Sequence, residues 1–80
     1  MNIPNELKDI LTSNPEVVSG AVCFKGTRVP VEIFFDYIST GYTLDRFLHG
    51  FPSVSRHQAM AVLDWQSKES KKSIGLELVA

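Results

Sequence analysis

Apolar residues recur every three or four positions in the second half of the chain, which is the spacing of one helix face. The first such run follows Pro30, which suits the first turn of a helix, and stops at Gly41, a residue typical of helix ends. Its apolar positions are Ile33, Phe34, Tyr37 and Ile38. The second run follows the N-cap residue Thr43 and is ended by Gly50 and Pro52. Its apolar positions are Leu44, Phe47, Leu48 and Phe51. The pattern therefore predicts two short amphipathic helices in succession.

A third helix is predicted from the strongest start signal in the chain. Ser55 and Gln58 have the spacing of a capping box, in which the serine hydroxyl accepts from the backbone of the glutamine and the glutamine side chain reaches back. The positions that follow at core spacing are Ala59, Val62 and Leu63, with Ala61 and Trp65 widening the stripe. The pattern weakens after Gln66, so the polar segment from Ser67 to Ser73 is expected to fray or to be disordered.

The first half of the chain favours extended structure. Residues 1–11 form either a helical turn after Pro4 or the lead-in to a short strand ending at Ile10 and Leu11, and we favour the strand. Residues 12–15 have the composition of a turn. Residues 21–24 and 27–29 favour strands, and the two-residue connection between them, which contains Gly26, predicts a tight hairpin rather than an irregular loop. Such a hairpin is marginal alone and should pack against the rest of the domain.

Together these elements predict one α+β domain that is mainly α, with a short N-terminal β element followed by a three-helix core. A chain of 80 residues has room for one hydrophobic core. We place the domain at residues 1–67 and a polar, flexible tail at residues 68–80. Because a core of this size is small, dimerisation is expected to complete it.

Charge and cysteine content narrow the class of protein. The formal net charge of −1 argues against indiscriminate nucleic-acid binding but leaves room for a local basic face. The lone cysteine, Cys23, fits a reducing cytoplasm. The N-terminus lacks the features of a signal peptide, and residues 29–38 are too short and too charged to span a bilayer. A soluble, cytoplasmic protein without membrane contact is expected.

The reactive side chains do not predict an enzyme, a metal site or a cofactor. His49 and His57 lie eight residues apart with Cys23 far upstream, which fits no zinc spacing. No nucleophile–base order, phosphate-cradling glycine loop or pair of carboxylates is present. Cys23, in a β-favouring run, is interpreted as a small core residue.

The second and third predicted helices, with the short turn at residues 51–54, have the arrangement of a helix-turn-helix. In that motif the N-terminal end of the second helix presents side chains to the major groove. The exposed positions there are Ser55, Arg56, His57 and Met60. Arg56 can pair bidentately with guanine, His57 can reach a base or a phosphate, and Ser55 can contact a phosphate. The alternative is a capped amphipathic helix with a solvated first turn.

The segment Gly26-Thr27-Arg28 is interpreted separately. Gly26 is expected to adopt a positive φ, and Thr27 to bond a nearby backbone group. Arg28 either forms an ion pair with Glu32 or Glu16, or contacts a phosphate. A guanidinium can form two parallel hydrogen bonds with either kind of group, and we favour the carboxylate.

Motifs spread over most of the chain, from Ile10 to Trp65, carry a family resemblance. They are Asn14-Pro15-Glu16-Val17-x-x-Gly20, Gly26-Thr27-Arg28-Val29-Pro30-Val31, Gly41-Tyr42-Thr43 and Phe51-Pro52-Ser53-Val54-Ser55. In order and spacing the chain resembles family four-three-three of the domains of unknown function, the VapB-like antitoxin family. Ala21-Val22 stands where proline is common, and Trp65 stands where a smaller or tyrosyl residue is common; both are interpreted as packing variations.

The resemblance implies a homeodomain-like helix-turn-helix protein that represses its own operon and neutralises a PIN-like toxin. The expected partners are operator DNA, that toxin and a second copy of the chain. The alternative is a protein-interaction module with a helix-turn-helix shape and no DNA binding, which the near-zero net charge favours.

The C-terminal segment offers a further partner-binding hypothesis, in which its apolar residues add a strand to a partner or dimer sheet. Those residues are Ile74, Leu76, Leu78 and Val79. A frayed or folded-back tail is the alternative.

Overall fold

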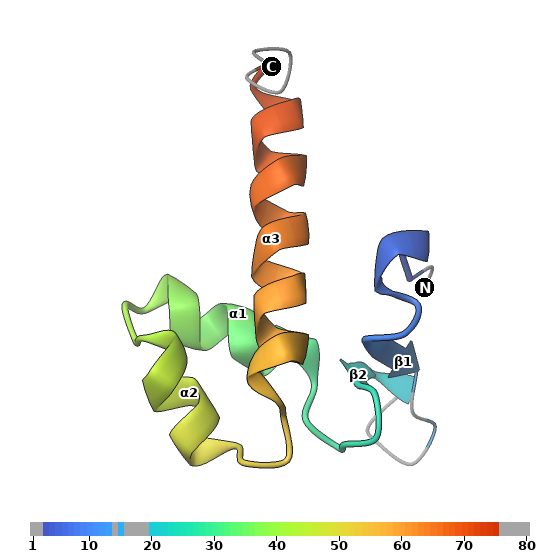
Figure 1. Ribbon diagram of the computed structural model, residues 1–80, viewed down its shortest axis with the longest axis vertical. Coiled ribbons are helices and arrows are strands. Elements are labelled where there is room, and N and C mark those ends of the chain that lie inside the picture. Colours follow the sequence, from blue (N-terminus) through green and yellow to red (C-terminus); the bar gives the residue numbers. More distant parts are fainter. Residues whose placement is uncertain (1–2, 14, 16–19, 76–80) are drawn as a thin grey trace.

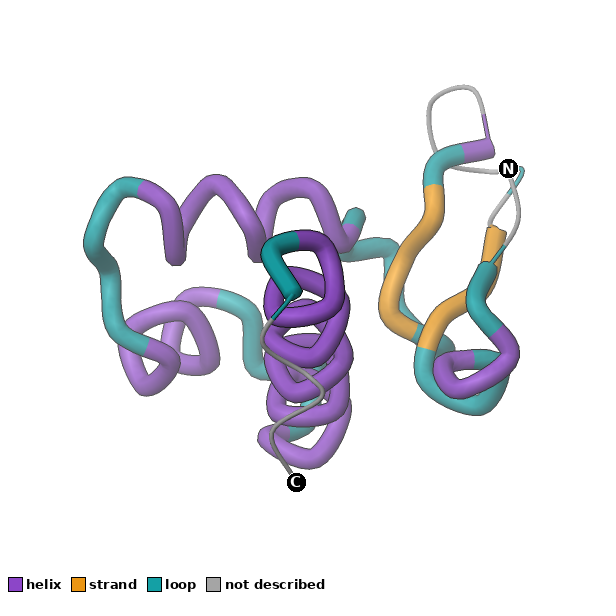
Figure 2. The backbone as a smooth tube through the Cα atoms, turned by 90° about the horizontal axis from the view of Figure 1, so that it is seen from above, coloured by secondary structure: helices purple, strands orange, loops and turns teal. Residues whose placement is uncertain are grey.

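The structure is a computed structural model and describes residues 3–13, 15 and 20–75. A short 3-10 helix, η1 (Asn5–Leu7), precedes two strands, β1 (Leu11–Ser13) and β2 (Val22–Phe24). Three helices follow, α1 (Val31–Ser39), α2 (Leu44–Gly50) and α3 (Arg56–Ser73). Helix α3 stands at the centre, with α1 and α2 on one side and the strands and η1 on the other (Figures 1 and 2). The predicted class, α+β and mainly α, is confirmed.

The strands pair differently from the prediction. β1 and β2 are antiparallel, with Leu11 opposite Phe24 and Ser13 opposite Val22. Residues 27–29 are not the partner strand, so the predicted two-residue hairpin is wrong; only one isolated bridge joins Cys23 to Pro30 in the described part of the chain. The reason lies in Thr27, whose hydroxyl donates to the Phe24 carbonyl at 2.8 Å. The same oxygen accepts from the Val29 amide at 3.0 Å, and these bonds close a loop in place of a ladder.

The N-terminal segment contains both of the alternatives that its sequence left open. A helical turn, η1, follows Pro4, and a strand follows it, but the strand begins at Leu11 instead of ending there. Thr12 and Ser13 were predicted as a turn and instead belong to β1. Burial of Leu11, together with the available edge of β2, outweighs their local turn preference. Residue 14 of the predicted turn, and residues 16–19 after it, lie outside the described residues.

The predicted starts of the three helices and the ends of α1 and α2 are confirmed to within a residue. Pro30 is the N-cap of α1 rather than part of its first turn, and Gly41 follows the C-cap with a φ of +94°. The Thr43 hydroxyl accepts from the Arg46 amide at 3.1 Å and caps α2. Both halves of the capping box between Ser55 and Gln58 are formed at α3. These are bonds within one helical turn, which explains why the sequence alone located them.

Helix α3 is longer than predicted. It continues through residues 67–73, which were expected to fray or be disordered, so the proposed start of a flexible tail at residue 68 falls inside the helix. Ion pairs along the helix support this extension, Lys68 with Asp64 at 3.1 Å and Lys72 with Glu69 at 3.4 Å. Lys71 and Lys72 also place positive charge in the last turn, where the helix dipole favours it.

The core is built around three fully buried phenylalanines, one from each of β2, α1 and α2. Phe34 lies edge-on to Phe24 and Phe47, with ring centroids 5.7 and 4.7 Å apart. The other buried apolar residues pack around this cluster; they are Leu7, Ile10, Leu11, Cys23, Val54, Ala59 and Val62. The cluster fixes the strands and the first two helices against the lower half of α3.

Replacement of Ser55 by alanine is expected to lower the free energy of unfolding by about 1 kcal/mol, because the amide of Gln58 loses its capping acceptor. Urea unfolding followed by circular dichroism measures this change. Ser53→Ala, an exposed serine two residues earlier, is the matched control and should leave the midpoint nearly unchanged. Equal effects of the two substitutions would contradict a specific capping role.

Candidate functional site

The residues predicted to contact DNA lie at the start of α3. The chain leaves α2, turns at residues 51–55 and runs back along α3 (Figure 1). Val54 is buried at the turn, and its amide donates to the Phe51 carbonyl at 3.0 Å, so the turn is fixed to the core. Arg56, His57 and Met60 are exposed beyond it, and Met60 keeps 49% of its surface accessible. The structure therefore brings these three side chains together on one solvent-facing end.

Ser55 has a structural role at the same place. Its oxygen accepts from the Gln58 amide, and its own amide donates to the Gln58 side chain, both at 3.0 Å. A hydroxyl retains one O–H donor when its oxygen accepts a bond. Ser55 can therefore cap the helix and still donate to a ligand.

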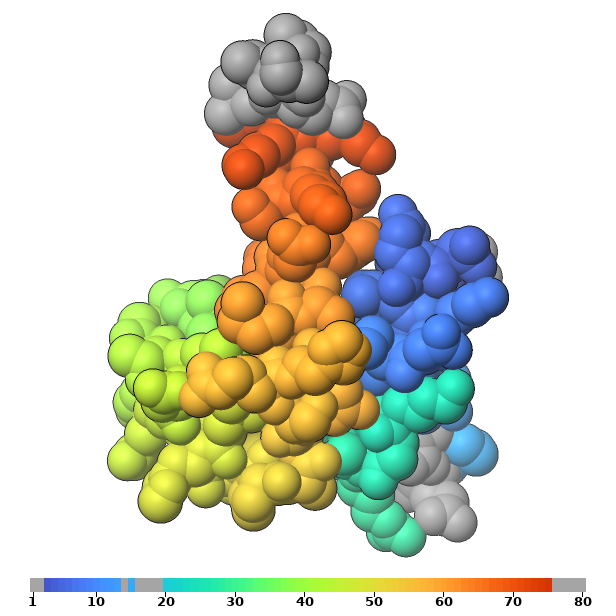
Figure 3. Space-filling model, in the orientation of Figure 1, coloured from blue at the N-terminus to red at the C-terminus, as the bar shows by residue number. Residues whose placement is uncertain are grey.

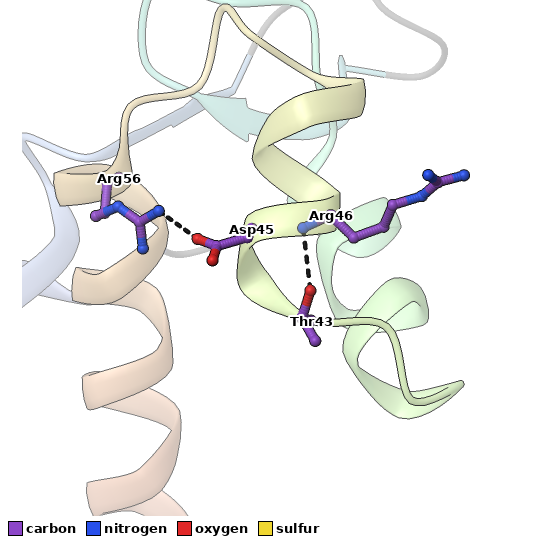
Figure 4. Close-up of polar contacts among 4 residues, drawn as sticks. All are labelled: Thr43, Asp45, Arg46 and Arg56. Atoms are coloured by element: carbon purple, nitrogen blue, oxygen red, sulfur yellow. Dashed lines mark hydrogen bonds and ion pairs between the residues drawn. The ribbon is translucent and has the colours of Figure 1, made fainter.

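Arg56 forms an ion pair with Asp45 of α2 (Figure 4). Both side chains are largely exposed, at 61% and 78%, so the pair lies on the surface and is worth about 0–1 kcal/mol. Arg46, the next residue on α2, points away from this pair (Figure 4). The pair positions the Arg56 guanidinium over α2 and partly neutralises it. The sequence did not reveal this contact, since its partners are 11 residues apart on different helices.

A second segment joins the start of α3 through Gln58. Its side-chain amide donates to the Lys25 carbonyl at 2.9 Å, across 33 residues of sequence. This bond fixes the loop between β2 and α1 against the first turn of α3. Gly26 in that loop has a φ of +79°, and buried Thr27 bridges Phe24 and Val29, as expected for both residues. Lys25 and Arg28 are exposed in the loop and thus share this end of the molecule with Arg56.

The start of α3 and residues 25–28 together form one surface, here called the basic end. This surface carries mostly positive charge. Lys25, Arg28 and Arg56 lie on it, and no acidic residue occurs in residues 20–31 or 55–63. Asp45 is the acid that α2 contributes. The other acids of the described residues lie elsewhere, on η1 and the segment after it, on α1 and farther along α3; they are Glu6, Asp9, Glu32, Asp36, Asp64 and Glu69. A net charge near zero therefore conceals a local basic end. Sequence reasoning missed Lys25 because the signal, the bond to Gln58, is tertiary.

Ile74, the one predicted partner-binding residue within the described part of the chain, is remote from this surface. Ile74 is the C-cap of α3, at the opposite end of that helix from Arg56, and is 71% exposed (Figure 1). Leu76, Leu78 and Val79 lie outside the described residues. The DNA-contact residues and Ile74 therefore belong to two separate surfaces.

Within the described ranges, no three His, Cys, Asp or Glu side chains gather closely enough to hold a metal ion. The same part of the chain contains no helix with the length and apolar character needed to cross a membrane.

Cys23 is a core residue, as its position in a β-favouring run predicted. Its side chain is fully buried, and its thiol faces the Ala21 carbonyl at 3.6 Å. Burial raises the pKa of the Cys23 thiol above its ordinary value of 9.0, because the thiolate is poorly solvated there. The thiol is correspondingly a poor nucleophile at neutral pH.

We expect Cys23 to be almost inert to a disulfide reagent in the native protein and fully reactive in denaturant.

Because the folded pKa of Cys23 is raised, its contribution to stability is complete below pH 9.0 and falls as pH rises through the folded pKa. Urea midpoints measured on both sides of that pH, for the natural chain and for Cys23→Ala, isolate this contribution. We expect the urea midpoint to fall more steeply with rising pH in the natural chain than in Cys23→Ala. Equal falls in the two proteins would contradict a contribution from Cys23.

Comparisons with known proteins cover most of this architecture. The model of the family described as "Protein of unknown function (DUF433)" matches residues 11–65, from β1 to the middle of α3. An uncharacterised protein of Sinorhizobium fredii, y4eO, is 34% identical over 47 residues, which is 59% of this chain and 21% of that protein. The chain thus spans about a fifth of this relative's length. No solved structure matches. The matched span contains the loop at residues 25–28 and the start of α3.

Proposed function

We propose that this chain, which belongs to the family "Protein of unknown function (DUF433)", binds double-stranded DNA through the start of α3 and the loop at residues 25–28. The observation that carries the proposal is the hydrogen bond from Gln58 to the Lys25 carbonyl, which unites these segments into one basic end. DNA affinity comes largely from phosphate neutralisation, and sequence preference comes from a few base contacts. The basic end supplies groups for both.

Each exposed side chain has a chemical role in this proposal. Arg56 pairs with a guanine edge, and His57 contacts a base or phosphate. Met60 packs against a thymine methyl group, and the Ser55 hydroxyl donates to a phosphate. Lys25 and Arg28 hold the phosphates that flank the groove, which matches the phosphate alternative for Arg28.

The biological role that we propose is that of a cytoplasmic antitoxin. By resemblance to VapB-like antitoxins, the chain would repress its own operon as a dimer on DNA and neutralise a PIN-like toxin. Ile74, at the far end of α3, would leave the basic end clear for DNA while a toxin is bound. The helix-turn-helix arrangement of α2 and α3 supports the DNA-binding part of this role.

Fluorescence anisotropy with the duplex upstream of the gene tests the proposal, with a scrambled duplex of equal length as the control. We expect tighter binding to the natural duplex and a steep loss of affinity with salt, because each neutralised phosphate releases a counterion. Lys25→Ala together with Arg28→Ala should weaken binding to both duplexes alike and lower the salt slope by about two. No preference for the natural duplex at low salt would contradict sequence-specific binding.

The second candidate function is a protein-interaction module that does not touch DNA. The net charge of −1 favours it, as does the ion pair that already engages Arg56. Such a module would bind its partner through apolar contacts with little salt dependence, so the same salt series separates the two functions.

A further inference from the structure

The upper half of α3 stands clear of its own domain and forms one wall of a groove, whose other wall is η1 (Figure 3). The groove has a volume of about 560 Å³. Leu7, Ala61 and Trp65 supply its apolar surface. Its charged residues number three of each sign, namely Glu6, Asp64 and Glu69 with Lys68, Lys71 and Lys72. The groove is therefore neutral overall, with a charged rim.

A smaller hollow of about 220 Å³ adjoins it, and both are lined by Leu7 and Trp65. All the other residues of this hollow are apolar or proline, and they include Val62 and Phe35. The indole Nε1 of Trp65 is buried there and has no hydrogen-bond partner among the described residues. A buried donor without a partner is uncommon in protein interiors.

We propose that a second copy of this chain occupies the groove, with the two α3 helices antiparallel about a two-fold axis near residues 68 and 69. The groove face of α3 carries adjacent charges of opposite sign at these two positions. A two-fold axis repeats every contact in reverse, so a residue i that meets j of the other copy is matched by j meeting i. With the axis between residues 68 and 69, Lys68 of each copy faces Glu69 of the other. The surface is thereby complementary to itself.

This register also brings a cation of one copy to an aromatic side chain of the other. Lys72 falls opposite Trp65, where an ammonium group can lie over the indole ring.

The proposed dimer specifies the pairing that the proposed function requires, and its formation does not depend on DNA contacts. The two α3 N-termini lie about 38 Å apart in this register, from the helical rise alone. Neighbouring half-sites on one side of B-DNA are about 34–36 Å apart. The arrangement therefore places the two basic ends at a separation close to one turn of DNA.

Sedimentation equilibrium of the full chain, without DNA, tests the proposal. We expect a dimer in the natural chain and a dissociation constant raised about tenfold by Lys68→Glu or by Glu69→Lys, since each creates two like-charge contacts at once. The double variant Lys68→Glu/Glu69→Lys should regain the natural dissociation constant. Within each helix of that variant, the acid introduced at position 68 still meets Asp64 and the base introduced at position 69 still meets Lys72. These like-charge contacts remain, so recovery can come only from contacts between copies.

Circular dichroism verifies that each variant keeps its helix. A natural chain that stays monomeric at every concentration would overturn the proposal, and so would a double variant as weak as the single ones. Because no DNA is present, these outcomes test the dimer of the proposed role separately from its DNA contacts.

Discussion

Phe47→Ala is expected to lower the free energy of unfolding by about 3–5 kcal/mol, the usual cost of removing a fully buried aromatic ring. Phe47 lies at the centre of the aromatic cluster, with ring centroids 4.7 Å from Phe34, 4.9 Å from Phe51 and 5.5 Å from Tyr37. An 80-residue domain has a total stability on the order of 4–12 kcal/mol. The substitution therefore leaves the domain barely folded. Urea unfolding, followed by the fluorescence of Trp65, measures the loss.

Tyr42→Ala is the matched control at the edge of the same cluster. Tyr42 is 51% exposed and contacts Tyr37 with ring centroids 5.1 Å apart, so its removal should cost no more than about 1.5 kcal/mol. Phe47→Leu, which retains most of the buried volume, should fall between the two. An equal loss for Phe47→Ala and Tyr42→Ala would contradict the central place of Phe47.

Arg56→Ala is expected to weaken binding to the natural duplex by about 5- to 150-fold, the range for one bidentate base contact of about 1–3 kcal/mol. Asp45→Asn should strengthen DNA binding about two- to fivefold, for two reasons. Arg56 no longer has to break an ion pair in order to contact DNA, and one negative charge near the DNA is removed. Anisotropy titrations at two salt concentrations measure both changes.

Arg46→Ala is the control for charge, since Arg46 has the same side chain on α2 and points away from Arg56 (Figure 4). It should reduce affinity much less than Arg56→Ala does. The gain from Asp45→Asn should shrink in an Arg56→Ala background, because its benefit acts through the guanidinium. Equal losses for Arg46→Ala and Arg56→Ala would indicate a general charge effect and contradict a base contact.

The sequence determined the helices because their signals act within one turn. Thr43 and Ser55 cap helices through amides three residues ahead, and Gly41 ends α1 because it adopts a positive φ. The apolar stripes then decided which helix faces are buried. The same local signals located the start of α3, and with it four of the residues proposed to contact DNA.

Only the tertiary structure decided how the segments meet. β2 offered two possible partners, and burial of Leu11 selected β1 over residues 27–29. The bond from Gln58 to Lys25 and the pair between Arg56 and Asp45 join residues 33 and 11 positions apart, beyond the reach of helical periodicity. The local sequence of residues 67–73 predicted fraying, yet ion pairs one turn apart extend α3 through them. Local bonding thus fixed where the helices lie in the sequence, whereas long-range packing fixed the sheet, the basic end and the groove.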